Sequence, residues 1–263
     1  MTDQFPQPGE QGRAVTEPST PPPIAHRIEY EHLAIAANGE AGLRGWSHRF
    51  ERAWFEGRAY ECRTLLIGVK GEGIELSQTG RAIVLRCQGL LALLQELYPR
   101  AAANFRAALA LSTEAGDDLL AGRLLNDLGT VAQACGELAA AVNHYRSALQ
   151  RLPPVALDTG DAAMMRNNLG LALVSLDERA AGLAELEQAR ATYEQLGYPQ
   201  GLARTQINLG QIYARQGDHV AAMAAYQEAL VTLRRFGENR TIAEVLNSLG
   251  VLAKTQGQFE QAA

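Results

Sequence analysis

The sequence lacks several features that mark common classes of protein. Its three cysteines, Cys62, Cys87 and Cys135, are odd in number and form no CxxC pair, so neither a disulfide framework nor a zinc site is indicated. No apolar run approaches the roughly 18 residues of a membrane span, and the N-terminus is polar rather than signal-like. We therefore expect buried free thiols, a reducing compartment and a cytoplasmic protein without a membrane partner.

Positive charge and aromatic residues are also scarce. The chain of 263 residues has 24 Lys and Arg against 29 Asp and Glu, a formal net charge of −5. This balance argues against a nucleic-acid partner, which would need a basic surface to displace counterions. Aromatic residues make up only 6% of the chain, while apolar residues make up 47%. Because alanine and leucine dominate the apolar set, the composition favours helices over strands.

Signatures of catalysis are missing as well. The stretch GVKGEG, residues 68–73, places Lys70 between glycines without a preceding strand, unlike a phosphate-binding loop, so we interpret it as a turn. The five histidines show no spacing suited to metal binding, and no nucleophile stands beside a base. We expect that the protein is not an enzyme and that it has no cofactor and no metal site.

Two segments precede the regular part of the chain. Residues 1–23 hold most of the prolines among Gln, Glu, Ser and Thr, and we expect a disordered tail, with a polyproline docking segment as the alternative. Residues 24–75 carry Trp46, Phe50 and Trp54 at four-residue spacing, which is one stripe on a helix. We interpret this segment as a degenerate helical N-terminal cap that packs the stripe on the next unit; the alternative is an exposed aromatic docking site.

From residue 76 onward one short signature recurs at a fixed spacing. Five glycines lie 40, 41, 40 and 40 residues apart: Gly89, Gly129, Gly170, Gly210 and Gly250. A small residue follows each of them by twelve positions, and the first four of these are followed four positions later by a large residue: Phe105, Tyr145, Leu186 and Tyr226. A fixed period indicates a stack of similar units, each unable to bury its apolar face alone. The small residues would let two antiparallel helices approach closely, with the large residue filling the space between them.

This pattern resembles the tetratricopeptide repeat, with its W-x2-L-G-x2-Y and A-x3-F-x2-A segments. Two features depart from it. The aromatic position four residues before the glycine is occupied by Leu85, Leu125, Arg166, Gln206 and Leu246, and the period is about 40 rather than about 34 residues. The longer period is similar to the repeats of bacterial signalling proteins and kinesin light chains. The resemblance implies an all-α, right-handed superhelical solenoid of antiparallel helix pairs, with about five repeats over residues 76–263 and the last one incomplete.

The register also predicts the helices. We expect a looser pair within residues 26–69, followed by pairs at 79–96 with 99–115, 119–134 with 138–152, 160–175 with 179–196, 200–215 with 219–236, and 240–255 with a helix beginning at 259. Gly136 and Gly217 would lie in left-handed turns between the partners of a pair.

In this family the first helices of the repeats line a concave groove, and particular positions around each glycine face inward. The resemblance therefore implies a peptide-binding groove in which amides pair with a peptide backbone and arginines hold a carboxylate. The candidate residues are Arg123, Asn126, Gln133, Asn167, Asn168, Arg204, Asn208, Gln211, Arg215 and Asn247. The alternative role for the asparagines is helix packing.

Two functions remain open. The first is a non-enzymatic scaffold for protein–protein interaction that binds a peptide or partner segment in the groove. The second is the sensor or regulatory arm of a larger signalling protein whose effector domain lies beyond residue 263, which the early stop in the fifth repeat favours. The sequence does not identify the protein or peptide partner or the oligomeric state.

Overall fold

The computed structural model describes residues 24–69, 74–236 and 239–255, and this part of the chain is helical without strands. The helices are α1 (Ile24–Phe55), α2 (Ala59–Gly68), α3 (Gln78–Leu94), α4 (Tyr98–Glu114), α5 (Asp118–Ala134), α6 (Leu138–Arg151), α7 (Gly160–Ser175), α8 (Arg179–Gln195), α9 (Pro199–Arg215), α10 (His219–Phe236) and α11 (Asn239–Thr255), with a short 3₁₀ turn η1 (Pro154–Ala156) after α6. The expected disordered tail, most of the turn at 68–73 and the helix beginning at 259 lie outside the described residues.

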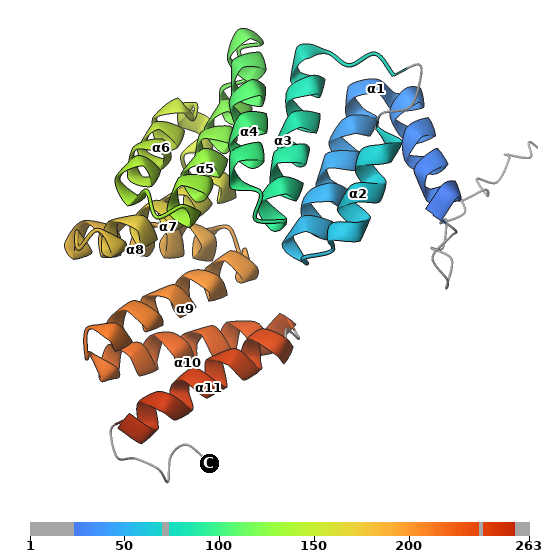
Figure 1. Cartoon of the computed structure of the whole chain (residues 1–263). Helices are drawn as coiled ribbons and strands as arrows, with labels where there is room; N and C mark the ends of the chain where they lie inside the picture. The colour runs from blue at the N-terminus through green and yellow to red at the C-terminus, as the bar shows by residue number, and fades with distance from the viewer. Residues whose placement is uncertain (1–23, 70–73, 237–238, 256–263) are drawn as a thin grey trace, which may run out of the picture.

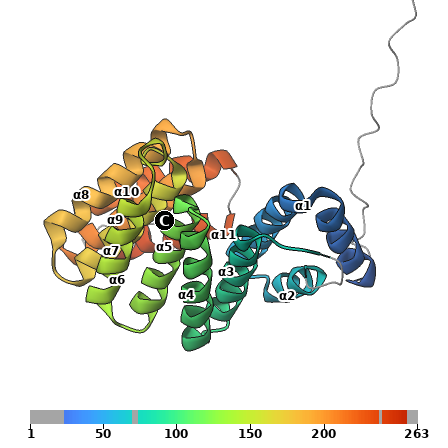
Figure 2. The same cartoon turned by 90° about the horizontal axis from the view of Figure 1, so that it is seen from above.

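The helices form consecutive antiparallel pairs that stack into a right-handed superhelical α-solenoid. The closest packing is within the pairs α3–α4, α5–α6, α7–α8 and α9–α10, and each pair then packs on the next. Figure 1 shows the stack turning along its length: α3 and α4 run up the view, whereas α8 to α11 run across it. The view from above, in Figure 2, shows the N-terminal pair α1–α2 at one end of the array.

The recurring glycines are the points at which paired helices meet. A Cβ atom on Gly129 would lie 2.5 Å from the ring of Tyr145, and one on Gly210 would lie 2.8 Å from the ring of Tyr226. Gly89 faces Phe105 and Gly170 faces Leu186 in the same way. The predicted close contacts are therefore confirmed at four of the five glycines. Gly250 meets nothing within 4 Å among the described residues, because the helix expected to oppose it lies outside them.

The turns within pairs follow the predicted geometry. Gly136 and Gly217 have φ values of 81° and 78°, the left-handed region that glycine adopts without strain. Glu96 and Asp177, at the equivalent places in the other pairs, also adopt positive φ. The turn shape is thus a property of the repeat rather than of the residue.

The aromatic stripe of α1 is buried in the N-terminal pair. Trp46 and Phe50 are fully buried, and the Trp46 indole N–H donates to the carbonyl of Leu65 in α2 at 3.0 Å. The Trp54 indole N–H donates to the carbonyl of Leu90 in α3 at 2.8 Å. The stripe therefore joins α1 to both α2 and α3, and it does not form the exposed docking site considered above.

Candidate functional site

The first helices of successive repeats are joined by a ladder of polar side chains. In each rung, the residue three positions before the glycine of one repeat bonds the residue two positions before the glycine of the next. Asn168 in α7 donates to the Oδ1 of Asn126 in α5 at 2.9 Å. Asn208 in α9 donates to the Oδ1 of Asn167 in α7 at 3.0 Å. The asparagines that recur two and three positions before the glycines thus form hydrogen bonds between neighbouring repeats.

The N-terminal rung of the ladder is ionic. The guanidinium of Arg86 in α3 donates to Asp127 in α5 at 2.6 Å and pairs with Glu51 in α1. Burial opposes the charge on Arg86, but the two carboxylates outweigh it and raise its pKa. Burial also raises the pKa of Asp127, while the charge of Arg86 acts in the opposite direction. A buried ion pair of this kind is costly to break, since either partner alone would be an uncompensated charge.

Two of the candidate asparagines are buried and bonded within the protein. Asn126 is 3% exposed and Asn167 is 2% exposed. Asn167 also accepts from the hydroxyl of Thr205, which is fully buried in α9. The polar atoms of Asn126 and Asn167 thus bond neighbouring first helices in this structure.

Two further candidates are also engaged by protein groups. Arg123 in α5 binds both carboxylate oxygens of Asp161 in α7, at 3.0 and 2.7 Å. Gln133 accepts from the hydroxyl of Tyr145 at 3.0 Å, inside the pair α5–α6. Asn168 is partly exposed but already donates across the ladder. The first helices α5 and α7 therefore offer few unengaged polar groups.

The ladder ends at α9. The position that carried Arg86, Asn126 and Asn167 in the earlier repeats is Ile207 here, and Ile207 packs in an apolar cluster with Val245 and Leu252 of α11. An isoleucine side chain has no hydrogen-bonding atom, so no rung of this type can form between α9 and α11. At this position of the register the last described interface is apolar, whereas the earlier ones are polar.

The helix α9 carries the exposed members of the candidate set. Arg204, Gln211 and Arg215 are exposed and Asn208 is partly exposed, and their spacing of four, three and four residues places them in one stripe along the helix. Neither arginine has a carboxylate partner among the described residues. Arg204 instead hydrogen-bonds Tyr193, whose pKa is raised by burial and lowered again by this arginine. Asn247 in α11 is exposed as well.

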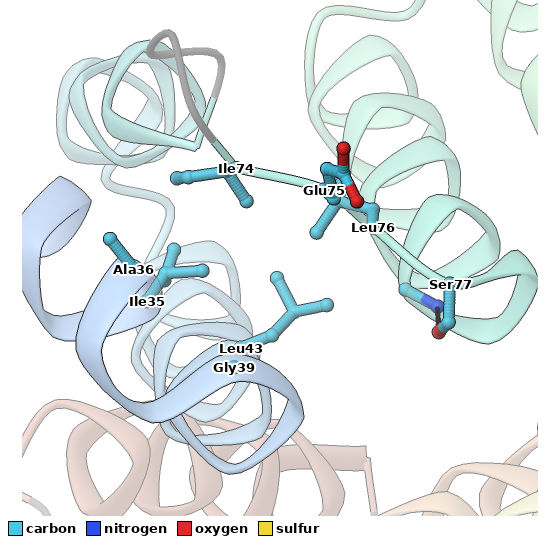
Figure 3. Close-up of a pocket in the computed structure, with 9 residues that line it drawn as sticks. Ile35, Ala36, Gly39, Leu43, Ile74, Glu75, Leu76 and Ser77 are labelled. Carbon is cyan, nitrogen blue, oxygen red and sulfur yellow. Dashed lines mark hydrogen bonds between the residues drawn. The ribbon is translucent and has the colours of Figure 1, made fainter.

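A small cavity lies where α1 bends. Gly39 has φ 52° and ψ −127°, which interrupts the helix. The cavity of about 80 Å³ is lined mainly by apolar side chains of α1 and of the segment before α3, including Ile35, Leu43, Ile74 and Leu76 (Figure 3). Its volume admits a few water molecules at most, so it is too small to be the functional site.

The thiols fall into two classes. Cys62 and Cys87 are buried, as expected, and burial raises the pKa of Cys62 to about 11. Cys135 is exposed at the end of α5, so the expectation that all three are buried is wrong for it. None of the described helices is long and apolar enough to cross a membrane, and no group of three or more His, Cys, Asp or Glu side chains within the described ranges is placed to hold a metal ion.

The ladder could have been found from the sequence. Its bonded pairs are separated by 41 or 42 residues, one or two more than the repeat period, and each pair matches two amides or two opposite charges: Arg86 with Asp127, Asn126 with Asn168, and Asn167 with Asn208. This match between a residue of one repeat and a residue of the next is not visible when each repeat is considered separately. Arg86 was missed for that reason, and its second partner, Glu51, lies in α1 outside the repeats.

Comparisons with known proteins agree with this architecture. Residues 161–235, which span α7 to α10, match the family described as Tetratricopeptide repeat. No curated protein sequence matches the chain at a significant level. Among solved structures, BtubC (BKLC) from P. vanneervenii has a TM-score of 0.63 at 20% identity, covering 84% of this chain and 86% of that one.

Two further structures of peptide-bound proteins share the fold. A Rap protein complexed with Competence and Sporulation Factor has a TM-score of 0.63 at 14% identity, covering 91% of this chain and 73% of that one. NprR in complex with its cognate peptide NprX has a TM-score of 0.59 at 15% identity, covering 90% of this chain and 70% of that one. The recurring glycines at the helix contacts, the stacked pairs and these comparisons lead to one conclusion: residues 161–235 match the tetratricopeptide repeat, and the described chain has the α-solenoid fold of the structures it resembles.

Proposed function

We propose that the protein is a non-enzymatic scaffold that binds an extended peptide or partner segment along the stripe of α9, on the concave side of the solenoid. The observation that carries this proposal is the pair of exposed arginines, Arg204 and Arg215, that lack carboxylate partners among the described residues. The candidate residues on α5 and α7 all form hydrogen bonds within the protein. Within the candidate set, the available positive charge is therefore concentrated on α9.

The spacing of the stripe suits an extended chain. Eleven residues of helix separate Arg204 from Arg215, a rise of about 16 Å, which about five residues of extended peptide would span. Between the two arginines lie Asn208 and Gln211, and an amide side chain offers both a donor and an acceptor to a peptide backbone. A guanidinium at either end would hold a carboxylate of the peptide with paired hydrogen bonds.

Structures with the same fold support the choice of a peptide. Three of them are complexes, one with Competence and Sporulation Factor, one with the cognate peptide NprX and one with the Phr* peptide. These ligands belong to those proteins. Their relevance here is that a solenoid of this shape accommodates a bound peptide.

The test compares the two arginines of α9 with one control arginine in the full chain. Random peptides are selected on the wild-type protein, and the affinity of the selected peptides is then measured for Arg204→Ala/Arg215→Ala and for the control Arg106→Ala, an exposed arginine of the second helix α4. We expect the double variant to bind about ten- to a hundredfold more weakly, since each charge-assisted hydrogen bond contributes on the order of 1.5–3 kcal/mol. The control should bind as the wild type does.

Salt provides a second measurement. Binding at an exposed stripe of arginines should weaken as ionic strength rises, because mobile ions screen solvated charges. Circular dichroism of each variant checks that the helices are intact. Equal affinity of the wild type and the double variant, with folding preserved, would rule out the α9 stripe as the binding surface.

A further inference from the structure

A second cleft lies on the opposite side of the N-terminal junction, between α2, α3 and the start of α4. Its volume is about 450 Å³, which falls within the range of about 300–1,000 Å³ typical of ligand sites. Its apolar lining includes Leu66 of α2 and Leu91 and Ala92 of α3. Its polar lining is cationic or neutral: Arg63, Gln88, Gln95 and Arg100.

The polar contacts of α1 with α3 lie away from the cleft. Trp54 of α1 bonds the carbonyl of Leu90, and Glu51 of α1 pairs with Arg86, both in α3. These contacts tie α1 to one face of α3. The other face, which carries Leu91 and Gln95, is left to border the cleft with α2.

The charge in the cleft is uncompensated. Neither Arg63 nor Arg100 has a carboxylate partner in the part of the chain that the structure describes, although the whole chain carries a net charge of −5. With its amide oxygen facing α2, Gln95 accepts from Nη2 and Nε of Arg63 at 2.6 and 3.1 Å. This neutral partner fixes the position of the guanidinium without cancelling its charge.

The start of α4 adds to the positive potential. Its N-cap residue is Leu97, no side chain caps its first turn, and that turn contains Arg100 and no acidic residue. The equivalent N-cap positions of the later second helices are acidic: Glu137, Glu178 and Asp218. Since the N-terminus of a helix favours negative charge, the cationic first turn of α4 is unfavourable unless an anion comes close to it.

Apolar surface continues beyond the cleft. Tyr60, Arg63 and Ile67 follow one another at spacings of three and four residues on α2 and so share a face. Tyr60 is 64% exposed and Ile67 is 57% exposed. A small anion would fill only the space between the arginines, whereas an extended segment would cover the apolar residues on either side as well.

We propose that this cleft is a second binding site, for an acidic segment of a partner protein whose carboxylate lies between Arg63 and Arg100 and whose neighbouring apolar side chain contacts Leu66 and Leu91. The site is independent of the α9 stripe: the two share no residue, and the cleft borders the N-terminal pair. A partner is bound there by charge and apolar contact together, as in other interfaces with a cationic rim.

The experiment is designed to separate the two sites. Random peptides are selected on the full chain carrying Arg204→Ala and Arg215→Ala, which removes the arginines of α9. The selected peptides are then measured against this protein, against the same protein with Arg63→Glu and Arg100→Glu, and against a control with Arg106→Glu and Arg234→Glu, two exposed arginines elsewhere. The last two proteins have the same net charge.

We expect selected peptides to place Asp or Glu beside Leu, Ile or Phe, and to lose about tenfold or more in affinity for the Arg63→Glu/Arg100→Glu protein but not for the control. Ile67→Ser should weaken binding severalfold with the charge unchanged. Equal loss in the charge-reversed protein and in the control would overturn the proposal. Displacement of the peptide by inorganic phosphate beyond the effect of sodium chloride at equal ionic strength would overturn it too, since a simple anion site would then account for the arginines.

Discussion

Arg123 in α5 and Arg204 in α9 occupy the same position of the repeat, six residues before the glycine, yet their surroundings differ. Asp161 in the next first helix binds both donors of Arg123. The residue equivalent to Asp161, nine positions before Gly250, is Thr241, which carries no charge. One residue of the following repeat therefore decides whether the arginine pairs within the protein or presents its charge to solvent.

The same contrast extends along the array. In the N-terminal part, Arg86 is buried between Glu51 and Asp127, and the ladder continues through the asparagines to α9. In the C-terminal part, Arg204 and Arg215 are exposed. Polar residues at these positions of the repeat thus join neighbouring repeats where they find a partner in the next one and are exposed where they do not.

The largest expected effect comes from breaking the buried ion pair. Arg86→Ala leaves the carboxylates of Glu51 and Asp127 without their cation and should lower the free energy of unfolding by about 3–5 kcal/mol. Arg204→Ala should change it by less than about 1 kcal/mol, because that side chain is exposed and has no carboxylate partner. Urea unfolding followed by circular dichroism measures both. Similar losses in the two variants would show that the N-terminal and C-terminal arginines do not differ in role.

An intermediate effect is expected from the ladder itself. Asn167→Ala removes the acceptor of Asn208 and should cost about 0.5–1.5 kcal/mol, the net contribution of a hydrogen bond, because Thr205 still donates to the carbonyl of Gly201 and Asn208 is partly exposed. Asn247→Ala, at the same position of an exposed site, should be close to neutral. The midpoints of urea unfolding compare them. A neutral Asn167→Ala would mean that the ladder contributes nothing to stability and would return this residue to the list of ligand contacts.

The smallest expected effect comes from a substitution that gives Arg204 the kind of surroundings that Arg123 has. Thr241→Asp places a carboxylate where Asp161 stands in the earlier repeat and should give Arg204 an internal partner. Stability should change by less than about 1 kcal/mol, while peptide affinity at the α9 stripe should fall up to about fivefold. Thr241→Asn is the uncharged control. Unchanged affinity in Thr241→Asp would show that the charge of Arg204 does not contribute to peptide binding.

Much of the fold follows from the sequence because it depends on local periodicity. The helix bounds of the repeats agree with the predicted ones to within a few residues, and the pairing of Gly129 with Tyr145 was implied by the sixteen positions that separate them. Both features are set within a single repeat. Features of this kind can be predicted without knowing how one repeat is oriented against the next.

The environment of each candidate site residue follows less directly from the sequence, because it depends on relations between repeats. Whether Asn126 faces a groove or a neighbouring helix is decided by the rotation from one repeat to the next, which brings its amide to Asn168. The residue pattern within one repeat does not predict the rotation between two repeats. The cleft with Arg63 and Arg100 was missed for a further reason: it lies at the junction between α2 and α3, where the sequence does not repeat.

The replacement of a polar rung by Ile207 has a mechanical consequence. The hydrogen bond between Asn208 and Asn167 is directional and restricts the angle between α7 and α9, whereas the apolar cluster that Ile207 joins with residues of α10 and α11 is non-directional. At this position of the register, the orientation of α9 against the following repeat thus depends on how apolar side chains fit together and not on an amide–amide bond, beside the helix that carries Arg204 and Arg215.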